Sequence, residues 1–235
     1  MRDIGLTGLP GVGKSTLFTA LTHTGAAGGR SNQAVVPVPD PRLEILAEIE
    51  GSARIVPAQV RFVDVPGGLS SQAIATLREA DALAIVLAAF HPAADPAADL
   101  GTIRAELLLA DLANAERGLE RAERRAKGRA EEALADLDRL SRARDLLEAE
   151  RPLREGGWSD DDLKAMRGYG FLTLKPWIVV ANLQEGAGLP EALPEGTVAV
   201  YAAIEAEVSA MDPEEGAALL REFGVEEPGL RKLIR

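Results

Sequence analysis

A glycine-rich segment near the start of the chain carries the pattern best suited to chemistry. Residues 8–15 read Gly-Leu-Pro-Gly-Val-Gly-Lys-Ser, which fits the phosphate-binding pattern G-x-x-x-x-G-K-[ST]. Glycines let backbone N–H groups turn inward around the α- and β-phosphates of a nucleotide, and the positive end of a following helix adds to that anion site. We expect Lys14 to reach the β- and γ-phosphates, Ser15 to bind Mg²⁺ and Thr16 to lie near the α-phosphate. The predicted nucleotide-binding residues of this segment are Gly8, Leu9, Pro10, Gly11, Val12, Gly13, Lys14, Ser15 and Thr16.

A second motif, Asp64-Val65-Pro66-Gly67, begins 50 residues after Lys14 at the end of a predicted strand. It has the form D-x-x-G, in which the aspartate holds Mg²⁺ directly or through water and the glycine amide contacts the γ-phosphate. The predicted metal ligands are therefore Ser15 and Asp64, and the predicted catalytic residues are Lys14 and Gly67. An ordinary β-turn is the alternative interpretation. Gly68 follows the motif and has no side chain that could position an attacking water.

The segment Asn182-Leu183-Gln184-Glu185 follows another predicted strand, where GTPases carry the base-recognition element N-K-x-D. Glu185 is one methylene longer than the usual aspartate, and Leu183 replaces the usual lysine. We therefore do not expect the hydrogen-bonding geometry that selects guanine. We expect a base specificity that is relaxed or that favours adenine. The predicted base-contacting residues are Asn182, Leu183 and Glu185, followed by Ala202, Ala203 and Ile204, whose backbone would cover the base. A loop with no nucleotide contact is the alternative.

Short apolar segments separated by helical stretches must position these motifs. Strands are predicted at Ile4–Thr7, Gln59–Val63, Ala82–Ala89, Trp177–Ala181 and Val198–Tyr201, and a helix at Lys14–Thr22. The run Ala82–Ala89 is apolar throughout, which is typical of a strand buried on both faces. The pattern predicts an α/β fold with a mostly parallel sheet covered by helices on both faces.

The stretch 101–151 is rich in Ala, Leu, Glu and Arg and has a different periodicity. Apolar residues recur there at alternating steps of three and four, at Ala105, Leu108, Leu112, Ala115, Leu119, Ala122 and Ala126, and again at Ala130, Ala133, Leu137 and Leu140. Arg144 then stands where an apolar residue is expected, and Leu147 resumes the pattern. Such heptad spacing on both sides of Gly128 predicts an antiparallel coiled-coil hairpin with arms roughly 33 Å long. Two ordinary amphipathic helices packed on the sheet are the alternative.

Basic residues gather around the predicted tip of this hairpin, at Arg117, Arg121, Arg124, Arg125, Lys127 and Arg129. The plainer interpretation is a solvated helix face with pairs four residues apart, such as Glu120 with Arg124. The sharper one is a basic tip that touches an anionic partner such as RNA.

Composition excludes several classes of protein. The 235 residues are 46 % hydrophobic and contain 26 Lys and Arg against 37 Asp and Glu, a net charge of −11. A core can form, and general binding to nucleic acid or to anionic membranes is disfavoured. Without cysteine there are no disulfides, thiolate zinc sites or thiol catalysis, which fits a cytoplasmic location. No signal peptide or membrane span is predicted, and we expect a monomer.

Together these elements resemble the YchF subfamily of Obg-related P-loop proteins, the Obg-like ATPases. The matching stretches are GLPGVGKSTLFTALT, VVPVPDPRL, ELLLADL, YGFLTLKPWIVVANLQE and AAIEAEV. The resemblance implies a Ras-like P-loop nucleotide domain at 1–100 and 152–235, interrupted by the coiled-coil hairpin at 101–151. It also implies hydrolysis of ATP, in some members of GTP as well, and a link to ribosomes and stress responses.

Three departures from the family pattern affect this expectation. The sequence ends at Arg235, about where the family's C-terminal TGS domain would begin. The segment between Thr22 and Val35 is shorter than the family's first switch, and only Ser31 could stand in for its threonine. The second switch is also short, and Gln72 is the nearest side chain that could approach the attacking water.

These observations leave two main hypotheses. The first is a slow Mg²⁺-dependent hydrolase of ATP or GTP, linked to translation or stress. The second is a degenerate nucleotide-binding or scaffold module with little or no hydrolysis, because both switches are shortened. A small-molecule kinase would share the phosphate-binding loop, but the element at Asn182–Glu185 argues against it.

Overall fold

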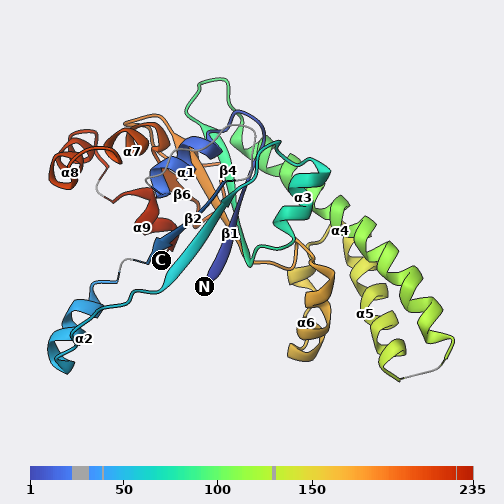
Figure 1. The fold of residues 1–235 in the computed structure, drawn as a ribbon. Coiled ribbons are helices and arrows are strands. Elements are labelled where there is room, and N and C mark those ends of the chain that lie inside the picture. Colours follow the sequence, from blue (N-terminus) through green and yellow to red (C-terminus); the bar gives the residue numbers. More distant parts are fainter. Residues whose placement is uncertain (23–31, 39, 129–130, 226, 235) are drawn as a thin grey trace.

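The computed structural model describes residues 1–22, 32–38, 40–128, 131–225 and 227–234 (Figure 1). The strands are β1 (Arg2–Thr7), β2 (Asn32–Pro37), β3 (Gln59–Asp64), β4 (Ala82–Ala89), β5 (Trp177–Leu183) and β6 (Val198–Val200). The α-helices are α1 (Lys14–Thr22), α2 (Arg42–Glu50), α3 (Ser71–Leu77), α4 (Pro96–Ala126), α5 (Glu131–Glu148), α6 (Asp160–Met166), α7 (Ala202–Val208), α8 (Pro213–Glu222) and α9 (Gly229–Ile234). Two short 3₁₀ helices, η1 (Leu153–Glu155) and η2 (Arg167–Tyr169), lie on either side of α6.

The strands of the described chain form one sheet in the order β2-β3-β1-β4-β5-β6. All neighbouring strands are parallel except β2, which pairs antiparallel with β3 at the edge. The five predicted strands are all present, with ends that differ by at most two residues from the predicted ones. The predicted mostly parallel α/β sheet is therefore confirmed.

Two apolar cores lie on the opposite faces of the sheet. Alternate residues of β4 point to opposite sides, so Ala84 and Val86 join one core and Ile85 joins the other. The first core includes Leu17 and Phe18 of α1, together with residues of β6, α7 and α9. The second contains residues of α3 and of the first half of α4. The continuous apolar run of β4 thus reflects burial on both faces.

The segment after the first helix contains two elements that the sequence did not reveal. Prolines at positions 37, 39 and 41 are typical of an extended, stiff connector, but β2 extends to Pro37 and α2 begins directly after Pro41. Proline has no backbone N–H to donate. Pro37 is tolerated because β2 is an edge strand, and on its open side no neighbouring strand of the sheet would accept a hydrogen bond from that position. No residue of α2 is buried, and the helix projects away from the sheet (Figure 1).

The inserted region is a hairpin of two long helices that lie side by side and project from the sheet (Figure 1). Ala115, Leu119 and Ala122 of α4 share a core with Leu140 and Leu147 of α5. The helix α4 begins at Pro96, before the predicted boundary at 101, and its residues Leu100, Ile103 and Leu107 belong to the core on the sheet. The proposed coiled-coil geometry and domain division stay predictions.

Gly118 lies inside α4 for a packing reason. A Cβ at this position would lie 3.1 Å from Cε1 of Tyr169 and 3.3 Å from a methyl of Leu140. The missing side chain therefore lets α5 and η2 approach α4 closely, which offsets the cost of a glycine in a helix. None of the described helices, long as α4 is, combines the length and apolar character that crossing a membrane requires.

A buried carboxylate fastens the hairpin to the rest of the molecule. Asp111 of α4 is fully buried and accepts hydrogen bonds from the amides of Leu172 (3.0 Å) and Thr173 (2.7 Å). It also accepts one from Nη1 of Arg78 (3.0 Å), the residue that ends α3. Arg78 donates further bonds to the carbonyls of Gly170 and Ala110. This group joins α3, α4 and the segment that leads into β5.

Candidate functional site

The glycine-rich segment connects β1 to α1 as a loop whose shape depends on its glycines. Gly8, Gly11 and Gly13 all have positive φ angles, of 152°, 83° and 89°. A Cβ at Gly8 would lie 2.3 Å from the carbonyl oxygen of Val86, so any side chain there would collide with β4. The loop therefore has the backbone conformation that the phosphate-binding pattern predicts.

Lys14, the first residue of α1, folds back over this loop. Its Nζ donates hydrogen bonds to the carbonyl oxygens of Gly8 (3.0 Å) and Leu9 (2.8 Å), and the side chain is 8 % exposed. Burial lowers the pKa of Lys14, and the nearby negative charge of Asp64 opposes that shift. The ammonium group is thus held at the loop, within the region that would receive the phosphates.

The two predicted metal ligands lie together beside this ammonium. Oγ of Ser15 donates a hydrogen bond to Oδ2 of Asp64 at 3.0 Å, although the residues are 49 positions apart. Nδ2 of Asn32, in β2, donates to the same oxygen at 3.3 Å. The other carboxylate oxygen, Oδ1, is buried without a hydrogen-bond partner in the described chain. Hydroxyl and carboxylate oxygens with one unsatisfied buried oxygen fit a Mg²⁺ ion, which prefers oxygen ligands.

The turn after Asp64 packs against the phosphate loop. Gly67 and Gly68 have positive φ angles of 86° and 64°, and a Cβ at Gly68 would lie 3.3 Å from Cδ of Pro10. Gly67 itself is exposed. Gln72 is exposed on α3. The Oγ of Ser70 lies close to Gly67, 3.3 Å from where a Cβ of that residue would stand, and it accepts a hydrogen bond from the amide of Ala73 at the start of α3.

The strand β5 continues two residues beyond its predicted end at Ala181, so the base-recognition element begins inside the strand. Asn182 is 6 % exposed and connects three segments of the chain. Its Nδ2 donates to the carbonyl of Val12 at 3.1 Å, and its Oδ1 accepts from the amide of Ala202 at 3.1 Å. A Cβ at Gly13 would lie 2.4 Å from the Asn182 amide nitrogen. Asn182 therefore fixes the phosphate loop against β5 and the start of α7.

The other predicted base contacts differ in accessibility. Leu183 is 3 % exposed and belongs to the interior, so its expected contact with a purine would require it to leave that position. Glu185 is half-buried, Ala202 and Ile204 are buried, and Ala203 is exposed. Their roles toward a base stay predictions.

Two participants were missed by sequence reasoning. Asn32 reaches Asp64 only because β2 pairs with β3, and no motif marked it. Glu205 is 5 % exposed and accepts from the amides of Tyr201 (3.0 Å) and Gly229 (2.6 Å), which fixes the loop after β6. Residues 23–31, which hold most of the expected first switch with His23 and Ser31, lie outside the described residues.

Comparisons with known proteins agree with this geometry. The model of a family described as 50S ribosome-binding GTPase matches residues 3–182. The ribosome-binding ATPase YchF of Haemophilus influenzae is 40 % identical, in an alignment that covers 98 % of this chain and 73 % of that protein. YchF of Bacillus subtilis is 31 % identical and is covered to 74 % of its length. The solved structure of the Schizosaccharomyces pombe YchF GTPase superposes with a TM-score of 0.80 at 25 % identity, covering 99 % of this chain and 74 % of the other.

The alignment with the Haemophilus influenzae relative extends over 266 positions, more than the 235 residues of this chain. The relative therefore carries additional residues inside the matched region.

Proposed function

The chain belongs to the 50S ribosome-binding GTPase family and, within it, to the YchF proteins, and from that membership we propose that it binds ATP or GTP with Mg²⁺ and hydrolyses the γ-phosphate slowly. The observation that carries this proposal is the juxtaposition of Lys14, Ser15 and Asp64 at the phosphate loop. These residues supply a cation for the phosphates and oxygen ligands for a metal within one small region.

Each residue has a defined task in this mechanism. The loop amides and Lys14 would hold the phosphates, with Lys14 exchanging its bonds to the Gly8 and Leu9 carbonyls for phosphate oxygens. Ser15 and Asp64 would hold Mg²⁺, which when bound neutralises the charge that develops on the phosphoryl oxygens. The Gly67 amide would contact the γ-phosphate. Because no side chain at Gly68 can orient water, the intrinsic rate should be low.

Base preference follows from the element at the end of β5. Asn182 holds the loop there, but Glu185 and Leu183 replace the aspartate and lysine that favour guanine. We therefore favour relaxed specificity that includes ATP. The relatives are named ribosome-binding ATPases, and we propose a ribosome contact for this chain as well, for which the basic residues around Arg124 offer a surface. A cytoplasmic location and a role linked to translation or stress are part of the same proposal.

Hydrolysis is tested by measuring phosphate release from ATP and from GTP with purified protein and Mg²⁺. We expect a slow release above background that Lys14→Ala abolishes. Lys164→Ala, which alters an exposed lysine paired only with Asp161, is the matched control and should behave as the parent. A parent trace at background level, the same as that of Lys14→Ala, would overturn the proposal and favour the scaffold hypothesis. A titration of ATP against GTP then decides the preferred base.

A further inference from the structure

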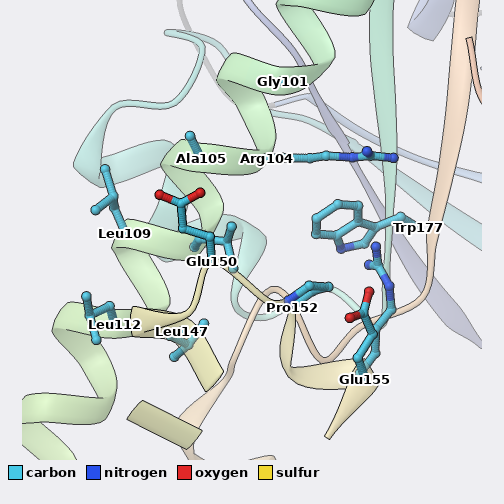
Figure 2. Close-up of a pocket in the computed structure, with 12 residues that line it drawn as sticks. Gly101, Arg104, Ala105, Leu109, Leu112, Leu147, Glu150, Pro152, Glu155 and Trp177 are labelled. Carbon is cyan, nitrogen blue, oxygen red and sulfur yellow. The ribbon is translucent and has the colours of Figure 1, made fainter. Parts of the chain in front are cut away.

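A cavity of about 530 Å³ lies at the base of the hairpin, away from the phosphate loop. It is formed by α4, the segment after α5 and the first residue of β5, Trp177 (Figure 2). Asn182 is five residues further along the same strand, which places the two sites roughly 16 Å apart. The cavity is therefore separate from the proposed nucleotide site, and its size falls in the range of small-molecule pockets.

One wall of the cavity carries two arginines and an aromatic ring. The guanidinium of Arg154 stacks over the Trp177 indole at 3.9 Å, and Arg104 reaches toward the same ring from α4 (Figure 2). Neither guanidinium has a hydrogen bond or a carboxylate within ion-pair distance among the described residues. Burial lowers the pKa of Arg154, and the positive charge of Arg104 lowers it further, whereas the negative charge of Glu155 opposes the shift. The two cations thus repel each other.

Neither of the carboxylates that border the cavity, Glu150 and Glu155, forms an ion pair with Arg104 or Arg154. Glu155 is 3.5 Å from Nε of Arg151, which it pairs with instead. Glu150 lies beside Ala105, on the side of the cavity away from the indole (Figure 2). The end of the cavity that holds Arg104 and Arg154 therefore carries positive charge, in a protein whose net charge is −11.

The opposite wall is apolar. Leucines from both hairpin helices line it, at Leu108, Leu109, Leu112 and Leu147. Leu147 is almost fully buried, whereas Leu109 is 60 % exposed at the mouth of the cavity. An apolar body could cover these side chains and the free part of the indole at the same time.

We propose that this cavity binds a small organic anion with a flat apolar body, its acidic group facing Arg104 and Arg154 and its body resting against Trp177 and the leucines. Two guanidiniums suit an anionic oxygen-bearing group such as a carboxylate or a sulfonate, because they offer several N–H donors to its oxygens. The small volume and the overall negative charge of the protein favour such a ligand over a polyanion. The proposal does not depend on nucleotide hydrolysis.

The test compares two fluorescent probes that differ only in their charge. 8-Anilinonaphthalene-1-sulfonate carries a sulfonate, and N-phenyl-1-naphthylamine is the same molecule without it. Binding is followed by quenching of Trp177 fluorescence in a Trp158→Phe background, with saturating Mg·ATP present to occupy the nucleotide site. We expect the sulfonate to bind more tightly, and the Arg104→Gln/Arg154→Gln variant to weaken it by about tenfold or more while leaving the neutral probe little changed.

Three further variants make the result decisive. Arg117→Gln removes an exposed arginine elsewhere on α4 and should not alter binding. Leu109→Glu adds a carboxylate at the exposed mouth and should weaken the sulfonate. Ile49→Ser tests the exposed apolar face of α2, where the probe could bind without a pocket. Equal affinity for the two probes, an unchanged affinity in the double arginine variant, or loss of binding only in Ile49→Ser would each overturn the proposal. Unaltered circular dichroism confirms that each variant is folded.

Discussion

At the scale of single residues, the site depends on Asn182 for its shape as much as on the charged groups for its chemistry. Lys14, Ser15 and Asp64 would supply charge and metal ligands in the proposed function, but the phosphate loop that carries the first two must stay against the sheet. Asn182 performs that task with both ends of its amide, toward Val12 and toward Ala202. Because both bonds are buried, their loss would leave an unpaired acceptor and an unpaired donor.

We predict that Asn182→Ala lowers both stability and nucleotide affinity. Two buried polar groups lose their partners, and each costs roughly 1–3 kcal/mol of unfolding free energy. Urea unfolding followed by circular dichroism measures the first effect, and a nucleotide titration measures the second. Gln184→Ala, two residues away and exposed, should match the parent in both. A variant as stable as the parent would show that Asn182 is not a structural link.

The site residues that could be predicted from the sequence are those that belong to a short local sequence pattern. Lys14 and Ser15 belong to one short pattern, and Asp64 ends a recognisable strand. The partners of Asn182 could not be predicted in this way, since Val12 is 170 positions away and Ala202 is 20. Their contact depends on the order of strands in the sheet, which local patterns do not encode.

At the scale of elements, the hairpin is joined to the helix that follows the D-x-x-G motif. Arg78 ends α3 and binds Asp111 of α4, while Lys175 donates a hydrogen bond at 2.7 Å to the carbonyl of Arg78. Only a few residues separate Gly67 from α3, so a movement of Gly67 would displace α3. The ion pair between Arg78 and Asp111 would pass this displacement to α4. The contacts of Arg78 with Asp111 and Lys175 therefore connect α3, which follows the proposed nucleotide site, to the inserted hairpin.

We predict that Asp111→Ala strongly destabilises the protein. The substitution leaves Arg78 and the amides of Leu172 and Thr173 without their buried acceptor, a loss on the order of 3–5 kcal/mol for a broken buried ion pair. Denaturant unfolding measures it. Asp145→Ala breaks an exposed pair with Arg144 in α5 and should leave the unfolding midpoint unchanged within error. Equal midpoints for the two variants would show that Asp111 does not fasten the hairpin to the rest of the protein.

The same carboxylate predicts a dependence on pH. Burial raises the pKa of Asp111, although the amides of Thr173 and Leu172 and the charge of Arg78 oppose this. The folded protein therefore binds a proton at a pH where the unfolded chain, with a pKa near 3.9, does not. The contribution of Asp111 to the free energy of unfolding therefore increases as the pH falls toward the pKa of the unfolded chain. The difference in unfolding free energy between the parent and Asp111→Asn should thus grow in favour of the parent as the pH is lowered from neutral toward about 4, and a shrinking difference would contradict this.

Elements with a clear periodicity were predicted, and elements governed by context were not. The buried run of β4 was located to the residue, and both hairpin helices were expected from their apolar spacing. In contrast, α2 buries no side chain, so its sequence lacks the amphipathic pattern on which prediction depends. The start of α4 at Pro96 was missed because its first apolar residues follow the sheet rather than the partner helix.

At the scale of the whole molecule, the nucleotide site is assembled from segments spread across the chain. The phosphate loop follows β1, Asp64, the proposed metal ligand, ends β3, Asn182 lies in β5 and Ala202 begins α7. A bound nucleotide would therefore contact segments from both ends of the sequence, which the hairpin separates. Ligands that bind only the folded state stabilise it as a whole, by an amount set by their concentration relative to the dissociation constant.

We predict that Mg·ATP raises the thermal midpoint of the entire protein. At a concentration 100 times the dissociation constant, the gain is about 2.7 kcal/mol, which for a domain of this size is roughly 5–11 °C. Differential scanning fluorimetry measures the midpoint. Chelation of Mg²⁺ should remove most of the shift, because Ser15 and Asp64 would then face the phosphates without the cation between them, and carboxylate and phosphate repel. Lys14→Ala should show no shift at the same concentration, while Lys164→Ala should show the full one. A shift that survives in Lys14→Ala would place the nucleotide elsewhere on the molecule.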